Sequence, residues 1–349
     1  MSAENGRVGW WSDRLGWPKI SSTLAAHRVP LNSFVFYLGG STLFLMLTQV
    51  GSGVLLLLYY QPDAALAYAS TERISGEIPY GTLIRNVHVW ASDLFVASLL
   101  AHVFAILVRR TYRPPHELTW LSGVVLLVLG LGLAFTGTIL PWSENAYTQA
   151  GVGSELASFV PVIGGWLRGF MRGGDEVTSS TLGHAFGFHV AALPAMVTTL
   201  VASHLFFLSR KSHRLAANAV CPPSAETIPL YPDGLVRLAA ALVGIFVVIM
   251  TLAIYFERPL GAAADPRMPS PAGARPPWYF LPFHQLVLLS PKELLGMDGA
   301  RFIVGIACLI GIVFVALPFL DRRGSRVVAF AACALLVVCL FLAATSALG

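Results

Sequence analysis

Residues 88–108 read HVWASDLFVASLLAHVFAILV, an apolar run that begins with a histidine and carries a second one near its end. Runs of this kind recur along the chain, each near the ~20 residues that cross the hydrocarbon of a bilayer. The full set is 33–59, 90–108, 120–140, 185–208, 235–255, 302–319 and 327–347. These runs predict an all-α membrane protein with seven transmembrane helices. Because ionisable side chains inside a membrane are costly and usually functional, the histidines are the first candidates for a site.

The composition agrees with a membrane protein. Of the 349 residues, 56% are hydrophobic and 12% are charged, about half the charged share of soluble domains. The net charge of +5 requires no nucleic acid to explain it. The four cysteines show no C-x-x-C or C-x-x-C-H spacing, which argues against an iron–sulfur cluster or a covalent c-type haem held within this chain. They are Cys221, Cys308, Cys333 and Cys339.

Basic residues gather on one side of the predicted membrane. The N-terminal segment 1–32 and the connections 109–113, 210–237 and 322–326 hold more than half of the 23 lysines and arginines. Basic residues mark the cytoplasmic side, so we expect a cytoplasmic N-terminus and an outer C-terminus, in a bacterial inner membrane. The first segment has tryptophans among its basic residues and no apolar core, which predicts an interfacial helix and no cleavable signal.

Two outer connections, about 143–181 and 256–300, are long and rich in glycine and proline. Loops of that length inside a compact protein are more often functional than passive. We expect a cytoplasmic interfacial segment over 1–32 and a four-helix domain over 33–215. A three-helix C-terminal domain over 216–349 carries the second outer loop.

Histidines lie at matching depths on the second and fourth helices. His88 and His102 are 14 residues apart, which is ~21 Å along a helix axis and nearly the same face. His189 and His204 are 15 apart, and a bend at Pro194 can absorb the extra residue. Both helices run inward, so each pair can bind a haem iron from two sides inside a four-helix bundle. Hydrogen bonding between helices is the alternative, but four histidines at two matched depths favour haem.

Glycines on the first and third helices repeat the axial spacing of the histidines. Gly39 and Gly53 are 14 residues apart, and so are Gly123 and Gly137. A glycine leaves room for a porphyrin against a helix, so these four are expected near the haems. His184 has no partner at its own depth, and we expect it beside a haem without binding the iron.

Five short stretches add a family resemblance. They are YGTLIRNVH at 80–88, ELTWLSG at 117–123, GTILPW at 137–142, PVIG at 161–164 and LRG at 167–169. They resemble the cytochrome b family of Rieske-type quinol oxidoreductases, the bc and bf complexes, over nearly the whole chain. The 15-residue histidine interval resembles the chloroplast form, in which the four-helix and three-helix parts are separate polypeptides. Here the two parts are fused.

The resemblance implies a subunit of a proton-translocating quinol–cytochrome c oxidoreductase. Quinol would be oxidised on the outer side, and electrons would cross two b-haems to quinone on the inner side. The implied partners are a Rieske-type iron–sulfur protein and a c-type cytochrome, with the quinone pool and lipid around a homodimer.

The second outer loop contains Pro276, Pro277, Trp278 and Tyr279 in sequence. It resembles the Pro-Glu-Trp-Tyr motif of the family's outer quinol site, with Pro277 in place of a glutamate that is assigned a role in accepting a quinol proton. Proline cannot take a proton, so another group must; the candidates are Glu144, Glu257, Asp265 and His284. Pro141 and Trp142, at the end of the third helix, are expected to wall the same site.

Two further departures concern the haems. Tyr37 stands where the chloroplast form has a cysteine bonded to an extra haem, so no covalent haem is expected. His184 stands where the family commonly has an arginine that neutralises haem propionates, which leaves Arg85 at the outer haem and Arg109 or Arg110 at the inner one. The inner quinone site is poorly marked; plausible residues are Ser21, His27, Arg28, Arg210 and Lys211.

Two other functions remain open at this point. A di-haem anchor that links a dehydrogenase to the quinone pool would also use transmembrane histidines, but it would not need the Trp278–Tyr279 loop. A haem-free transporter would need polar residues along a path and broken helices at mid-membrane. A haem spectrum separates the transporter from both redox proteins.

Overall fold

The computed structural model describes residues 12, 14, 16–31, 34–212, 226–265, 267, 275–322 and 325–348. Residues 1–11 of the N-terminal segment and the stretch 213–225, where we expect the seam between domains, lie outside these residues. Seven helices are long and apolar enough to cross a membrane, which confirms the predicted fold class. They are α3 (Phe34–Leu57), α5 (Gly81–Arg109), α6 (Glu117–Ile139), α9 to α10 (Ser179–Ser209), η2 with α11 (Leu230–Tyr255), α13 (Gly299–Leu320) and α14 (Arg326–Leu348).

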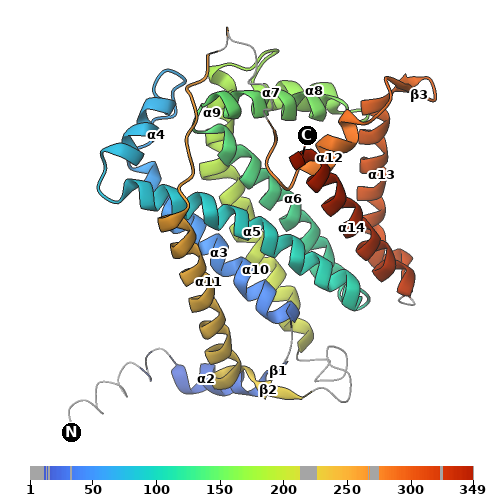
Figure 1. Cartoon of the computed structure of the whole chain (residues 1–349). Helices are drawn as coiled ribbons and strands as arrows, with labels where there is room; N and C mark the ends of the chain where they lie inside the picture. The colour runs from blue at the N-terminus through green and yellow to red at the C-terminus, as the bar shows by residue number, and fades with distance from the viewer. Residues whose placement is uncertain are drawn as a thin grey trace.

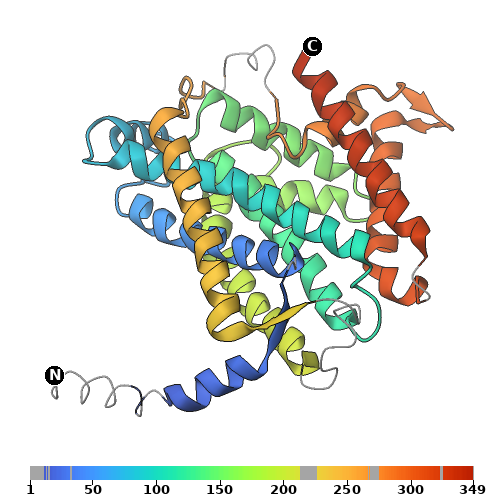
Figure 2. The same ribbon diagram turned by 60° about the horizontal axis from the view of Figure 1, so that its bottom comes forward.

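The first four spans form the bundle. Helix α3 packs along α5, and α6 packs along α10 (Leu193–Ser212). The three later spans divide around this bundle, as Figures 1 and 2 show: α11 lies on the side of α3 and α5, whereas α13 and α14 lie on the opposite side. The C-terminal spans therefore cover two faces of the bundle.

Helix α5 begins at Gly81, well before the apolar run that predicted it. Tyr80 before it has a left-handed backbone (φ 62°). A Cβ on Gly81 would lie 1.9 Å from the carbonyl oxygen of Ile74, so only glycine fits this close approach to α4 (Ala67–Gly76). The first turns of α5 carry the polar Arg85 and Asn86, both buried against protein. A hydropathy pattern cannot find a helix start whose polar residues are satisfied inside the protein.

The fourth span is interrupted by a wide turn. Helix α9 (Ser179–Gly187) passes into a π-helical turn, η1 (Phe188–Ala192), and then into α10. A π turn holds one more residue than an α turn. It therefore accommodates the 15-residue spacing of His189 and His204, directly before Pro194, where we had expected a bend to do so.

The outer connections contain short helices that the sequence pattern did not predict. They are α4 (Ala67–Gly76), α7 (Glu144–Ser158), α8 (Gly164–Arg172) and α12 (Leu281–Leu288), together with the small strands β3 (Glu293–Leu294) and β4 (Met297–Asp298). In Figure 1, α7 and α8 run across one end of the bundle, the end that we expect to face outward. The Ser143 hydroxyl accepts a hydrogen bond from the backbone N–H of Ala146 and caps α7.

At the opposite end, two short strands join distant parts of the chain. Strand β1 (Arg28–Pro30) follows α2 (Trp17–Ala26) and pairs antiparallel with β2 (Thr227–Pro229), which leads through η2 (Leu230–Gly234) into α11 (Leu235–Tyr255). The rings of Trp17 and Tyr231 meet edge to face at 5.7 Å. The predicted interfacial segment is thus attached to the start of the fifth span.

Candidate functional site

The structure brings His88 of α5 and His189 of η1 together. Their ring centroids are 6.2 Å apart with the planes at 78°. Metal–imidazole bonds are about 2 Å long, so two imidazoles on opposite sides of one metal ion have centroids about 6 Å apart. The Nδ1 atom of His88 lies 2.9 Å from the Ser52 hydroxyl, and that of His189 lies 3.0 Å from the Leu133 carbonyl oxygen. These contacts leave each Nε2 free for a metal.

His102 and His204 form a second pair deeper in the bundle, close enough to interact electrostatically. The Nδ1 atom of His204 lies 2.9 Å from the Ser122 hydroxyl. That of His102 is buried, and the backbone of Val35 is the hydrogen-bonding group beside this ring.

Each of the four predicted glycines faces one of these histidines. A Cβ on Gly137 would lie 2.7 Å from Cε1 of His189, and one on Gly53 would lie 3.2 Å from Cε1 of His88. A Cβ on Gly39 would lie 3.2 Å from Cε1 of His102, and one on Gly123 would lie 3.3 Å from Cε1 of His204. The glycines of α3 and α6 therefore admit the imidazole rings of α5, η1 and α10. That they also admit a porphyrin stays a prediction.

Aromatic rings connect the predicted outer residues. Trp278 and Tyr279 meet edge to face at 5.5 Å, Tyr279 meets Phe280 at 4.8 Å, and Phe280 reaches Phe135 of α6 at 6.2 Å. Phe135 packs against the buried cluster that contains Trp142. The second outer loop and the end of α6 thus share one aromatic region.

Backbone contacts fasten the outer loop beside Trp142, whose φ of 51° is left-handed. The Trp142 carbonyl accepts a hydrogen bond from the N–H of Ala264 at 3.2 Å, and the N–H of Glu144 donates to Ala262 at 3.0 Å. Pro141, just before it, is half-buried. Pro276 and Pro277 are also half-buried, and the Pro277 carbonyl accepts from the N–H of Phe280 at 2.8 Å.

Two charged residues that we did not single out from the sequence stand next to Trp278. Asp93 of α5 forms an ion pair with Arg258, which follows α11. The indole N–H of Trp278 donates to the other carboxylate oxygen of Asp93 at 3.0 Å. The Arg258 guanidinium lies 3.8 Å from the centre of the Trp90 ring. An aspartate inside an apolar run was the available signal, because such residues are rarely without a function.

Comparison with known proteins decides the family. The family model described as cytochrome b/b6/petB matches residues 24–212, more than half of the chain, and the model described as cytochrome b(C-terminal)/b6/petD matches residues 263–349. The chain belongs to the cytochrome b family. This confirms the resemblance to the fused b and subunit IV form that the sequence motifs indicated.

Individual relatives of this cytochrome b agree. The cytochrome bc complex cytochrome b subunit of Chlorobaculum thiosulfatiphilum is 35% identical over 91% of this chain and 74% of its own length. Cytochrome b6 of Heliobacterium mobile is 36% identical over 58% of this chain and 96% of its own. A solved structure described as hyperthermophilic respiratory Complex III matches with a TM-score of 0.84 and 24% identity, covering 97% of this chain and 91% of that one. This last match supports the fold alone.

Membership in the cytochrome b family implies haem b, and the histidine pairs fit it. Axial histidines of a haem reach the iron from two sides, as the facing rings of His88 and His189 would. No group of three or more histidines, cysteines and acidic residues comes together among the described residues. Each pair would therefore hold the haem iron with its two histidines alone.

The arginines expected at the propionates are placed differently from one another. Arg85 is buried, and its guanidinium donates to the carbonyl of Arg258 at 2.9 Å, so at least part of its bonding capacity holds the segment after α11. Arg109 is exposed at the inner end of α5, and Arg110 follows it with a left-handed backbone. Their role toward a cofactor stays a prediction.

His184 lies outside the two pairs. Its side chain is exposed, and its Nδ1 atom lies 2.7 Å from the Phe170 carbonyl oxygen of α8. A Cβ on Gly173 would lie 3.1 Å from its ring. His184 therefore joins α9 to α8, apart from the two histidine pairs.

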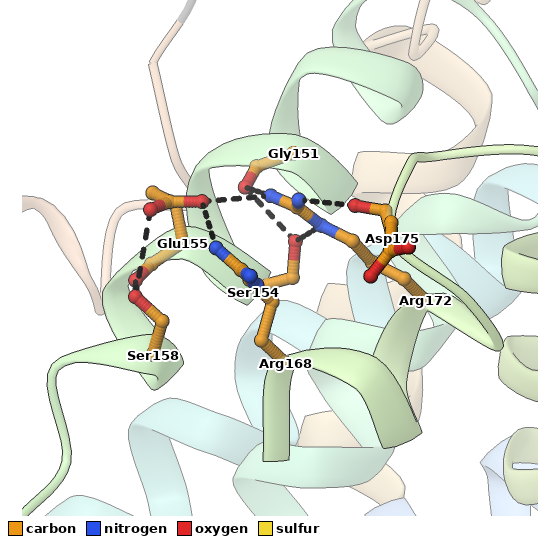
Figure 3. A network of polar contacts seen from close by, with 7 residues as sticks. All are labelled: Gly151, Ser154, Glu155, Ser158, Arg168, Arg172 and Asp175. Atoms are coloured by element: carbon orange, nitrogen blue, oxygen red, sulfur yellow. Dashed lines mark hydrogen bonds and ion pairs between the residues drawn. The ribbon is translucent and has the colours of Figure 1, made fainter. Parts of the chain in front are cut away.

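A polar network holds α8 on α7 at the outer surface of this cytochrome b, as Figure 3 shows. Arg172, only 13% exposed, lies 3.0 Å from a carboxylate oxygen of Glu155 and donates to the Ser154 hydroxyl at 2.7 Å. Arg168 reaches the same carboxylate at 3.8 Å. The network fixes the segment that resembles the family's outer connection.

The residues suggested for an inner quinone site make local contacts. The Nδ1 atom of His27 lies 2.8 Å from the Thr23 carbonyl oxygen, and the Ser21 hydroxyl donates to Pro18 at 3.1 Å. Arg28 donates to the hydroxyl of Thr227 at 2.8 Å and to its carbonyl at 2.6 Å. The side chains of Arg210 and Lys211 lie outside the described residues.

Proposed function

We propose that this chain is the cytochrome b subunit of a bc-type quinol–cytochrome c oxidoreductase. It is an integral membrane protein of the cytochrome b family with seven candidate spans. The observation that carries the proposal is the His88–His189 pair, whose ring centroids stand 6.2 Å apart. Neither the dehydrogenase anchor nor the transporter accounts for the two matching family models.

In this proposal His88 and His189 hold an outer haem b, and His102 and His204 hold an inner one. A haem held in this way takes and passes on one electron at a time. The protein's own contribution is orientation: the hydroxyls of Ser52 and Ser122, each 2.9 Å from a histidine Nδ1, fix the ring and its tautomer. Arg85 at the outer haem and Arg109 or Arg110 at the inner one are proposed to face the propionates.

Quinol is proposed to bind at the outer aromatic region and quinone to be reduced at the inner side. Pro141, Trp142 and the residues Pro276 to Tyr279 would line the outer site, where flat rings suit a quinone. Burial, and then the charge of Asp93, raise the pKa of the Tyr279 phenol, so it remains a hydrogen-bond donor at physiological pH. Such a donor could orient a quinone oxygen.

The partners, the membrane orientation and the domain division are part of the same proposal. A bc-type complex supplies a Rieske-type iron–sulfur protein and a c-type cytochrome as electron acceptors, and we propose a homodimer. The distribution of basic residues supports a cytoplasmic N-terminus and an outer C-terminus in a bacterial inner membrane. We propose the four-helix unit over 33–215 and the C-terminal unit over 216–349 as the two domains.

A haem count tests the proposal. The purified complex is reduced with dithionite, its difference spectrum is recorded, and haem is quantified as the pyridine haemochrome. We expect two b-haems per chain in the wild type, and loss of haem in His88→Ala and His204→Ala. His27→Ala is the matched control, because this histidine follows α2, outside the candidate membrane spans, and we expect it to keep both haems. Absence of haem from the wild-type chain would contradict the proposal.

A further inference from the structure

The membrane spans contain one acidic residue away from their ends. Glu117 and Asp233 lie in the first turn of their spans, whereas Asp93 lies in the middle of α5. It is five residues after His88, which places it ~7.5 Å farther into the membrane along the helix axis. A carboxylate at such depth is costly and needs partners.

The partners of Asp93 tie the four-helix bundle to the outer loop. Asn86, Trp90 and Asp93 lie on one face of α5, because they are spaced by four and three residues. Asn86 donates to the Ala253 carbonyl at 3.1 Å, and the Trp90 indole donates to the Phe256 carbonyl at 2.8 Å. This face of α5 therefore binds the end of α11 and brings Asp93 to Arg258 and Trp278.

The Asp93 carboxylate has bonding capacity left. An ionised carboxylate offers about four acceptor positions. One oxygen pairs with Arg258, and the other accepts from the Trp278 indole. The side chain is 26% exposed and so remains accessible. The charged and titratable groups around it are Arg258 and Tyr279, with Arg85 nearer the start of α5 and Glu257, after α11, close to Arg85.

The other candidate proton acceptors lack a position beside Trp278 and Tyr279. Asp265 pairs with the exposed Arg267 at 3.5 Å. Glu257 is exposed, and Glu144 stands in the first turn of α7. His284 lies in α12, one turn after Phe280, and its buried Nδ1 has no partner among the described residues. Asp93 accepts a hydrogen bond from Trp278, and its negative charge helps to raise the pKa of the Tyr279 phenol.

We propose that Asp93 is the group that accepts a proton from quinol at the outer site, which rests on the function proposed above. One quinol O–H bond breaks, and an O–H bond forms on the Asp93 carboxylate. The second quinol proton leaves to the outer water. The two electrons go to two one-electron acceptors, the iron–sulfur partner and a b-type haem. Arg258 pairs with the carboxylate before the proton arrives and again after it has left.

The test uses Asp93→Asn in the purified complex. Asparagine still accepts from the Trp278 indole but cannot take a proton, so it separates proton acceptance from positioning. We expect kcat for oxidation of a short-chain quinol, with cytochrome c as the final acceptor, to fall about 100-fold. KM should change by less than about threefold, and the haem content should not change. Asp93→Glu restores activity to within about tenfold of wild type.

Glu293→Gln is the matched control, because it removes an exposed carboxylate of β3 in the second outer loop. It is expected to oxidise quinol at the wild-type rate. Infrared difference spectra give a second readout: quinol addition to the oxidised complex should produce a protonated-carboxyl C=O band that is missing in Asp93→Asn and shifted in Asp93→Glu.

Equal kcat in wild type and Asp93→Asn would overturn the assignment of Asp93. If Asp93→Asn fails to assemble, as judged by its haem content, the Asp93→Glu variant and the wild-type infrared band decide, and absence of the band overturns the assignment. A wild-type complex that oxidises no quinol contradicts the proposed function itself, so the two failures are distinguishable.

Discussion

The four-helix bundle and the later spans use the same apolar residues differently. In the bundle, Gly53 and Gly137 each face a histidine of another helix, whereas Gly305 and Gly311 of α13 have open space where a Cβ would stand. In the most apolar 18 residues of the α6 span, 33% are buried. In the most apolar 18 residues of the α14 span, none is buried. Hydropathy is higher for α13 and α14 than for α6. Apolar character therefore identifies a span, but small and polar residues that face other helices identify the working part of the protein.

The largest expected effect compares glycines of the two parts. In Gly137→Val the new side chain would overlap the ring of His189, because a Cβ alone would lie 2.7 Å from its Cε1. We expect the variant to lose one of two b-haems, as measured by pyridine haemochrome. Gly311→Val in α13 is the control and keeps both. Full haem content in Gly137→Val would remove the functional distinction between the two sets of glycines.

A smaller effect is expected from the serines that bond the histidines. Ser52→Ala and Ser122→Ala each remove a hydroxyl 2.9 Å from a histidine Nδ1. Loss of such a supporting contact typically weakens binding of the metal group by about 10–100-fold. Transfer of haem to apomyoglobin should be faster in both variants. Ser98→Ala is the control, since that hydroxyl contacts Thr42 between α3 and α5 without touching a histidine, and its transfer rate should equal that of wild type.

A contact between the two parts at the inner end is expected to matter moderately. The Tyr112 hydroxyl, between α5 and α6, donates to the Asp321 carboxylate after α13 at 2.5 Å. Hydrogen bonds to charged groups contribute about 1.5–3 kcal/mol, so Tyr112→Phe should lower the unfolding free energy by about that amount. Tyr147→Phe, which removes a 3.2 Å bond to a neutral carbonyl within the outer connection, should cost less. Denaturant unfolding in detergent measures the loss of unfolding free energy in each variant. Equal losses would contradict a larger contribution from the Tyr112–Asp321 bond.

The smallest effect concerns α12. Burial lowers the pKa of His284 below its ordinary value of about 6.5. The unfolded chain then binds a proton that the folded chain does not, so stability falls as the pH drops below about 6.5. In His284→Phe this part of the acid destabilisation should disappear, which thermal unfolding at pH 7 and at pH 5.5 (about one unit below the ordinary pKa) can detect. An unchanged pH dependence would contradict the assignment of His284 as a buried neutral group.

The spans and the histidine pairing could be predicted because both rest on regular spacing. Fourteen residues return a helix to nearly the same face, so His88 and His102 revealed their arrangement without any knowledge of contacts. The start of α5 at Gly81 could not be read in this way, because Arg85 and Asn86 are polar yet buried. The short outer helices also escaped, since their length is below what hydropathy detects.

Asp93 and Arg258 were missed for a related reason. They are 165 positions apart, and only the packing of α11 on α5 brings them together. A sequence shows a charge inside a span, but it does not show which distant charge neutralises it. The role of the glycines could be predicted only in part. Their spacing is visible in the sequence, but the histidine ring that each glycine faces depends on which helices are neighbours.

The pairing of β1 with β2 has a consequence for how the gene can be organised. It joins Arg28–Pro30 to Thr227–Pro229 and thereby attaches the fifth span to the N-terminal part without using the peptide bonds between Ser212 and Glu226. Relatives named cytochrome b6 align to only part of this chain, since 96% of the Heliobacterium mobile protein is aligned to 58% of it. Non-covalent attachment of this kind allows one reading frame to be split into two, or two to be joined, while the assembled protein keeps its shape.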